Sequence, residues 1–123
     1  MKEVKTNNAP KAIGPYSQAI IVGDMVFTSG QIPVNPETGE IPEGIEAQAN
    51  QVFSNIKNLL EASGTNIRKT VKTTVFIQNM KDFQTVNKIY ETYFTSPYPA
   101  RSCVEVAKLP KEVLIEIEVI AQI

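Results

Sequence analysis

The sequence predicts an α+β fold in which two helices cover one face of a single mixed β-sheet. Three observations predict it. The length of 123 residues suits one domain, residues 1–123, and no internal repeat or Ser/Gly-rich linker divides the chain. Hydrophobic residues make up 42% and charged residues 20%, the composition of a globular domain with a core. Apolar periods of two and of 3.6 residues alternate along the chain in the order ββαβαββ.

The first elements are a strand pair and a long loop. The β-prone runs Ala19–Val22 and Met25–Ser29 flank Gly23-Asp24, a two-residue turn that can adopt the positive φ angles of a tight hairpin. Residues 31–44 contain three prolines and Gly39, which predicts an irregular loop.

Two helices and a strand follow. The apolar period becomes 3.6 at Ile45, and Gly64 is placed to end that helix. Residues 70–77 form a β-branched strand. The second helix is expected from about Asp82 to Phe94, with Asn79 or Asp82 as its cap. Its inward side chains are expected to be Phe83, Val86, Tyr90, Tyr93 and Phe94.

The last two strands, Arg101–Val106 and Leu114–Ala121, are joined by a loop containing Pro110 and are predicted to form a second antiparallel hairpin. The final strand and Ala19–Val22 carry apolar residues on both faces, although two helices can cover only one. We therefore expect the other face to be a subunit interface. The alternative is a half-exposed sheet with scattered apolar residues.

Charge and residue counts exclude several function classes. The 12 basic and 13 acidic residues leave a net charge of −1, which argues against a nucleic-acid-binding surface. There is no histidine, which excludes Ser-His-Asp and Cys-His catalysis and imidazole zinc sites. A single cysteine forms no internal disulfide, and no apolar run has the length of a membrane span or a secretion segment. We therefore expect a cytoplasmic protein with no metal or cofactor and no membrane partner.

The arginine at the start of a strand is the strongest candidate for binding an anion. Arg101 opens an otherwise apolar strand, and its fork matches a carboxylate bidentately. On spacing alone, an internal ion pair with Glu105, Glu116 or Glu118 is equally compatible. Glu116 and Glu118 share one strand face, a pattern that in glycosidases supplies an acid and a base but more often pairs with cations. Cys103 is expected to be a small buried residue and not a nucleophile.

Two turns add candidate binding groups. Tyr16 places an aromatic hydroxyl just before the first hairpin. Ser29 and Gly30 end a strand where backbone N–H groups can bind an anion or an oxyanion, although such a pair is usually only a turn.

Together these segments resemble the RidA (YjgF) family of reactive-intermediate imine deaminases over essentially the whole chain. The segments that carry the resemblance are Gly14-Pro15-Tyr16-Ser17-Gln18, Ser29-Gly30-Gln31-Ile32-Pro33, Val71-Lys72-Thr73-Thr74-Val75-Phe76, Pro99-Ala100-Arg101-Ser102-Cys103-Val104-Glu105-Val106 and Ile115-Glu116-Ile117-Glu118. The Pro-Ala-Arg-Ser segment, followed at this spacing by Glu116, is the specific part of the signature. Residues 94–99 are shorter than in some members of the family.

The resemblance implies a chorismate-mutase-like fold and a homotrimer whose sheets pack into a central barrel, with clefts between neighbouring subunits. It implies hydrolysis of 2-iminopropanoate and 2-iminobutanoate to 2-oxo acids and ammonia. Arg101 would clamp the substrate carboxylate, Glu116 would hold the attacking water, and the Cys103 backbone would contribute to the same site. The cleft would be lined by Tyr16, Ser29, Gly30 and Asn87.

Three other functions remain open at this point. A ligand-sensing protein would bind 2-oxo acids in the same clefts without turnover. Endoribonuclease or translation-inhibitor activity has been attributed to some family members, but the charge balance weighs against it. A chaperone-like role is the third alternative.

Overall fold

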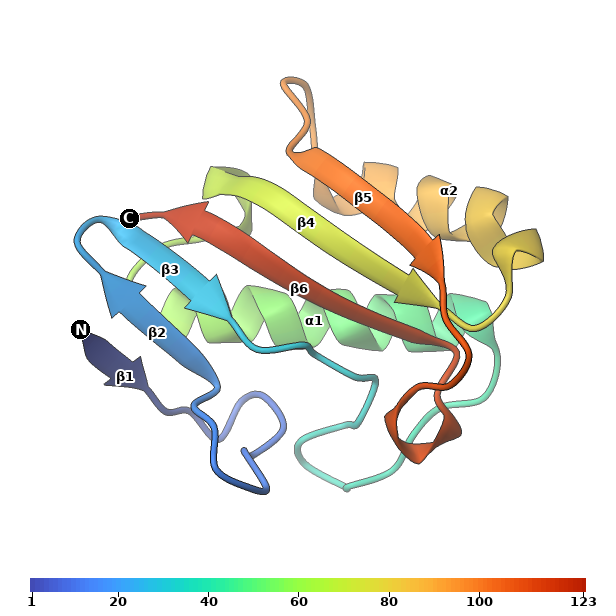
Figure 1. Cartoon of the computed structure of the whole chain (residues 1–123), viewed down its shortest axis with the longest axis horizontal. Helices are drawn as coiled ribbons and strands as arrows, with labels where there is room; N and C mark the ends of the chain where they lie inside the picture. The colour runs from blue at the N-terminus through green and yellow to red at the C-terminus, as the bar shows by residue number, and fades with distance from the viewer.

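A computed structural model describes all residues, 1–123. The strands and helices in chain order are β1 (Lys2–Val4), β2 (Ala19–Val22), β3 (Met25–Thr28), α1 (Ile45–Ala62), β4 (Thr70–Ile77), α2 (Phe83–Tyr93), β5 (Ala100–Glu105) and β6 (Ile115–Gln122). The six strands form one sheet in the order β1-β2-β3-β6-β4-β5, antiparallel except for β4 and β5 (Figure 1). The predicted mixed sheet of an α+β fold is confirmed.

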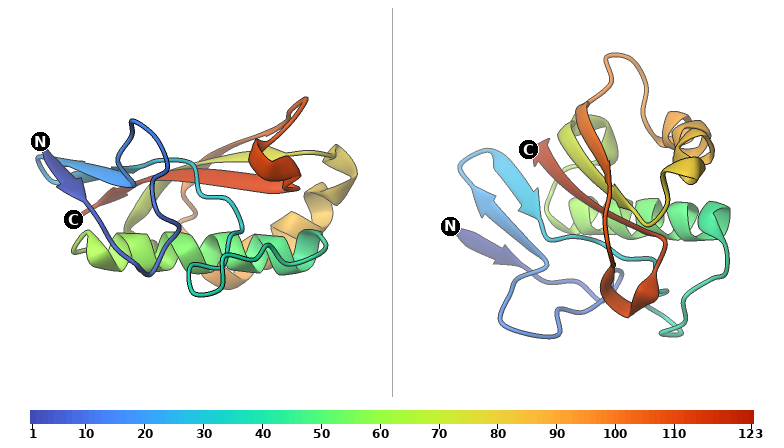
Figure 2. Two further views of the ribbon diagram at one scale, coloured as in Figure 1. Left: turned by 90° about the horizontal axis from the view of Figure 1, so that it is seen from below. Right: turned by 45° about the vertical axis from the view of Figure 1, so that its right-hand side comes forward.

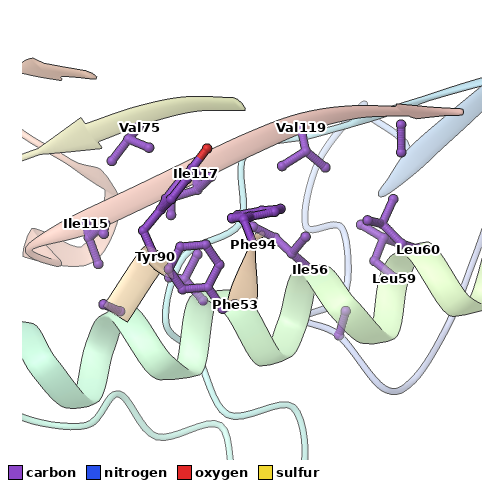
Figure 3. Close-up of a cluster of buried hydrophobic side chains, with 14 of the residues drawn as sticks. Phe53, Ile56, Leu59, Leu60, Val75, Tyr90, Phe94, Ile115, Ile117 and Val119 are labelled. Carbon is purple, nitrogen blue, oxygen red and sulfur yellow. The ribbon is translucent and has the colours of Figure 1, made fainter. Parts of the chain in front are cut away.

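Both helices lie on the same side of the sheet, as Figure 2 shows from below. The buried face of α1 supplies Val52, Phe53, Ile56 and Leu60, none of which is exposed to solvent. Figure 3 shows Phe53, Ile56 and Leu60 facing the inward residues of β6, with the rings of Tyr90 and Phe94 in the same cluster. The alternating burial of β6 confirms the predicted inward face of that strand. No helix is both long and apolar enough to span a membrane.

The turns that bound the helices follow the predicted residues. Gly64 has a φ of 88° just after α1, where a left-handed residue ends the helix. Of the two caps expected for the second helix, Asp82 stands at the N-cap position of α2, but its side chain makes no capping hydrogen bond. Asn79 caps the preceding 3-10 turn, where its side chain accepts a hydrogen bond from the Lys81 N–H. The long loop 31–44 is irregular, as predicted. The buried amide of Asn55 holds its start by donating to the carbonyls of Ile32 and Val34.

The predicted hairpin between the last two strands is wrong. β6 lies between β3 and β4, whereas β5 pairs in parallel with β4 at the edge of the sheet. The physical reason is the β4-α2-β5 unit, because a helical crossover makes the two strands parallel. β6 has apolar residues at every inward position and takes the covered centre of the sheet. The short edge strand β1 was not predicted, since only Val4 of its three residues is buried.

The face of the sheet away from the helices is apolar and uncovered within the chain. The strand pairings place Ile20 opposite Phe27, Phe27 opposite Ile120, and Phe76 opposite Val104 on this face. The Phe27 side chain is 44% exposed and that of Val104 is 43% exposed. We refer to this surface, made by Ile20, Val22, Met25, Phe27, Phe76, Val104 and Ile120, as the open face.

Candidate active site

Arg101 lies on the helix side of β5 and is held by one face of α2. Its Nη1 donates to Asn87 Oδ1 at 2.6 Å. Its guanidinium carbon lies 5.3 Å from the ring centroid of Phe83 and 4.9 Å from that of Tyr90. The spacing of the three helical residues, i, i+4 and i+7, puts them on one stripe of the helix. Arg101 is therefore oriented by an amide and two aromatic rings.

No carboxylate neutralises this guanidinium. The chain has one ion pair, between Lys5 and Glu3 at 3.5 Å. Glu105 instead accepts a hydrogen bond from the Met80 N–H at 2.7 Å. The internal ion pair that the spacing allowed is thus not formed. A half-buried guanidinium that lacks an anionic partner within the chain can bind an anionic ligand.

A pocket opens directly beside Arg101, with a volume of about 440 Å³. It lies between α2 and the segment before β5, and its lining residues are Asn87, Tyr90, Glu91, Tyr98, Pro99 and Arg101. The size suits a small molecule, and Arg101 fits a ligand that carries a carboxylate.

Cys103 follows Arg101 on the same face of β5, opposite Val75 of β4. Burial raises the pKa of its thiol, and the nearby Arg101 only partly opposes this. The thiolate is therefore disfavoured, which is the opposite of what an activated nucleophile requires.

A second group of predicted residues gathers around Glu116. Gln31 and Ile117 exchange backbone hydrogen bonds of 2.8 and 3.1 Å, which fixes the chain after β3 beside β6. Gly30 then lies against Glu116 so closely that a Cβ there would sit 2.8 Å from the carboxyl carbon. The Gly30 N–H has no acceptor within the chain. Ser29 Oγ donates to the carbonyl of Ser17 at 2.6 Å and joins this group to the preceding segment.

The carboxyl of Glu116 is electrostatically perturbed. Burial raises its pKa above the usual range of a carboxyl group, and the charge of Glu118 two residues along raises it further. Glu116 is the acidic residue in the chain whose pKa is shifted upward. A carboxyl of this kind exchanges protons closer to neutral pH than an exposed one.

Tyr16 lies near Gly30. It is half exposed and lines, with Gly30, a pocket of about 670 Å³ between the N-terminal loop, the loop after β3 and the turn before β6. Two lysines, Lys11 and Lys111, also line this pocket.

The two groups lie on opposite faces of the sheet. Thr73 is paired with both Arg101 and Val119, so these side chains share the helix side. Phe76 is paired with Glu116, which puts that carboxyl on the open face. The structure thus brings Arg101, Asn87 and Cys103 together on the helix side of the sheet. It places Gly30 against Glu116, and Tyr16 shares a pocket with Gly30, but the Arg101 group and the Glu116 group are not joined within one chain.

The sequence reasoning missed the roles of two residues. Phe83 and Tyr90 were expected only as inward packing residues, yet both contact the guanidinium. Their spacing with Asn87, at i, i+4 and i+7, puts the three side chains on one stripe of the helix. This indicates contact with Arg101 only once α2 is known to lie over β5. No group of three or more Cys, Asp or Glu side chains is arranged to hold a metal ion.

Comparison with known proteins identifies the family. The model of the Endoribonuclease L-PSP family matches residues 6–123. The chain is 56% identical over 123 residues to the 2-iminobutanoate/2-iminopropanoate deaminase of Escherichia coli K12, covering 98% of this chain and 96% of that protein. Its fold matches RidA from the Antarctic bacterium Psychrobacter sp. PAMC 21119 with a TM-score of 0.97 and 45% identity, covering both chains completely.

A further solved structure carries a ligand. Escherichia coli TdcF with bound serine matches with a TM-score of 0.95 and 48% identity, covering 100% of this chain and 99% of that one. Because the family model spans almost all of the residues and close relatives match end to end, this chain belongs to the Endoribonuclease L-PSP family, also called RidA/YjgF.

Proposed function

We propose that this protein is a 2-iminobutanoate/2-iminopropanoate deaminase, a hydrolase that converts 2-imino acids to 2-oxo acids and ammonia. The observation that carries the proposal is the half-buried Arg101 guanidinium, which lines a small pocket and has no carboxylate partner. The 56% identity to a deaminase of that name supports the same activity. The reducing cytoplasm is the proposed compartment, since the chain has one cysteine.

The reaction requires little from the protein beyond orientation. The oxygen of a water molecule bonds to C2 of the imine while the π electrons of the C=N bond move to nitrogen, and one proton of the water passes to that nitrogen to give a carbinolamine. The second proton then passes from the hydroxyl to nitrogen as the C–N bond breaks, so ammonia leaves and a carbonyl remains at C2. An imine carbon is already electrophilic, so fixing substrate and water in one geometry supplies the rate gain.

Each candidate residue has a distinct task in this scheme. Arg101 anchors the substrate carboxylate through the donors that Asn87 does not use. Glu116, with its raised pKa, holds the attacking water and exchanges protons with it. Gly30 offers its free N–H to the polar atoms of the substrate. Cys103 contributes through its backbone, since its thiol stays protonated.

The site is completed by a second copy of the chain. Arg101 and Glu116 point from opposite faces of the sheet, so one cleft needs the Arg101 group of one subunit and the Glu116 group of its neighbour. The uncovered apolar open face gives such an assembly its contact surface. We infer a homotrimer in which the sheets enclose a central barrel and Tyr16, Ser29 and Gly30 line the clefts.

Release of ammonia from a freshly generated imino acid tests this function. An amino-acid oxidase generates 2-iminobutanoate, and the lifetime of this imino acid is measured with and without the proposed deaminase. The expected result is a shortened lifetime and stoichiometric 2-oxobutanoate. Binding of 2-oxobutanoate without any ammonia release would favour a ligand sensor, and cleavage of RNA in the presence of chelator would favour a ribonuclease.

A further inference from the structure

We propose that Tyr90 is a positioning residue whose ring, anchored to Thr73, holds the Arg101 guanidinium with its unbonded edge toward the pocket. The inference rests on the proposed role of Arg101 as the carboxylate anchor. The ring of Phe83 makes a second contact with the same guanidinium. Arg101 is therefore oriented by aromatic contacts, whereas many buried arginines are oriented by a carboxylate.

The contacts at the guanidinium support this assignment. The ring of Tyr90 lies 4.9 Å and that of Phe83 lies 5.3 Å from the guanidinium carbon, both within the range of a cation–π contact. The single side-chain hydrogen bond of Arg101 goes from Nη1 to Asn87. One amide fixes one corner of a planar fork and leaves it free to turn about that bond, whereas two ring contacts at the guanidinium carbon restrict that turning.

Tyr90 is itself fixed from three directions. Its hydroxyl is 2.8 Å from Thr73 Oγ1, and Thr73 is fully buried directly opposite Arg101 in the pairing of β4 with β5. Its ring packs against Phe94 at 4.5 Å and edge-on against Phe53 at 5.8 Å. Figure 3 shows the Tyr90 oxygen directed toward the sheet and its ring among these core side chains. Burial also raises the pKa of Tyr90, so the phenol stays neutral.

A substrate carboxylate therefore meets a guanidinium that is already oriented. An unpaired arginine on a flexible stem loses side-chain freedom when it binds an anion, which weakens binding. Tyr90 removes much of that loss beforehand because its own rotamer is set by the strand and the core. Tyr93 provides a comparison within the same helix: its ring stacks on Phe53 at 4.6 Å but makes no contact with the guanidinium.

The first test reads the guanidinium directly and does not depend on activity. The chain has two arginines, so the ¹⁵N Nε–Hε signals of Arg68 and Arg101 are assigned with the Arg68→Lys variant. Ring currents should displace the Arg101 signal from that of Arg68. Tyr90→Leu and, independently, Phe83→Leu should move it back toward the Arg68 position, while Tyr93→Leu should leave it in place.

The second test reads the consequence for catalysis. Tyr90→Leu should raise KM for 2-iminobutanoate about tenfold with a smaller change in kcat, because ring contact with the cation is lost. Hydrolysis of an imine without a carboxylate should be unaffected. Tyr90→Phe combined with Thr73→Val removes both hydroxyls but keeps the ring and its packing on Phe94 and Phe53, so KM should stay within about threefold of the parent, below that of Tyr90→Leu. In an Arg101→Lys background, Tyr90→Leu should cause no further increase in KM.

The possible outcomes separate this inference from the proposed function. An undisplaced Arg101 signal in the parent, or one that Tyr93→Leu moves as much as Tyr90→Leu, overturns the positioning role. Equal losses on charged and uncharged imines overturn it as well, since they indicate a general packing defect. If Tyr90→Leu does not fold, Phe83→Leu decides the same question. A parent that shows the displaced signal but hydrolyses no imine contradicts the proposed function and leaves the aromatic contact supported.

Discussion

At the scale of single residues, the chemistry of Arg101 depends on the shape of its side chain as well as on its charge. Two parallel N–H donors match the two oxygens of a carboxylate, which a lysine ammonium cannot do. Asn87 already occupies Nη1, so the geometry of the remaining donors decides how a substrate lies.

Replacement of Arg101 by Lys keeps the charge and removes the fork. The variant should lose about a hundredfold or more in kcat/KM for 2-imino acids, equivalent to a few kcal/mol of transition-state stabilisation. Arg101→Ala should be worse, and binding of the 2-oxo acid product should weaken in parallel because it carries the same carboxylate. Steady-state kinetics together with product-inhibition constants measure both effects. Turnover by Arg101→Lys at the parent rate would make the guanidinium a structural group.

If Glu116 holds the attacking water as proposed, the activity should depend on pH. Its pKa is raised by burial and, to a smaller extent, by Glu118, so its carboxylate form appears at higher pH than that of an exposed glutamate. Because the pKa is raised in the folded chain, the contribution of this group to stability is greatest below its ordinary pKa and is lost as pH rises through the raised value.

The Glu118→Gln variant tests the smaller of the two causes that raise the pKa of Glu116. It should move the acidic limb of the kcat profile to lower pH, because one neighbouring negative charge disappears. Exposed Glu61 on α1 supplies the control variant Glu61→Gln, which should leave the profile unchanged. An acidic limb that stays in place in Glu118→Gln would assign it to a group other than Glu116.

At the scale of the elements, the close approach of the loop after β3 to β6 depends on Gly30. The backbone bridge between Gln31 and Ile117 sets the distance, and the missing side chain of Gly30 makes room for the carboxyl of Glu116.

Gly30→Ala should therefore displace Glu116 without preventing folding. The new Cβ would lie 2.8 Å from the carboxyl carbon, so the carboxyl must move. We expect kcat to fall about a hundredfold, as for a misplaced catalytic group, and unfolding free energy to fall by about 1–3 kcal/mol from overpacking. Kinetics and thermal unfolding measure the two effects. Glu116→Ala added to this variant should recover the lost stability, and failure to recover it would locate the strain elsewhere.

Local sequence patterns predicted most elements but not their neighbours in the sheet. The bounds expected from Ile45, Thr70 and Leu114 onward agree with α1, β4 and β6 to within a residue or two, because each carries a long, regular apolar period. The placement of β6 between β3 and β4 depends on contacts far apart in sequence, so a hairpin with β5 was the natural but wrong expectation. The aromatic contacts of Arg101 were missed for the same reason, since they require α2 to cover β5.

At the scale of the whole molecule, the open face is the surface on which the proposed assembly depends. It carries the exposed side chains of Val22 on β2, Phe27 on β3 and Val104 on β5. These strands belong to one sheet, and no element of the chain covers the three side chains. A patch of this kind on a 13.6 kDa chain is typical of a subunit contact.

Phe27→Glu should convert the proposed assembly to monomers, since it places a charge on the face where we propose that another subunit packs. Analytical ultracentrifugation should then report about 13.6 kDa, and imine hydrolysis should be lost while the helical circular dichroism persists. Met80→Glu is the matched control, because Met80 is 41% exposed but lies on the turn before α2. A parent that sediments as a monomer and still hydrolyses imines would refute the shared cleft.

The separation of Arg101 and Glu116 on opposite faces has a consequence for mixtures of damaged chains. Arg101→Ala and Glu116→Gln homo-oligomers should each be nearly inactive, yet each chain keeps the half that the other lacks. When equal amounts of the two variants are unfolded together and reassembled, half of the subunits carry an intact Arg101 and the other half carry an intact Glu116. About a quarter of the clefts should then regain both, and with them about a quarter of the parent activity. In a cell that expresses both variants, activity should return by complementation. A chain that carries both substitutions supplies neither half of a cleft and so should restore activity to neither single variant.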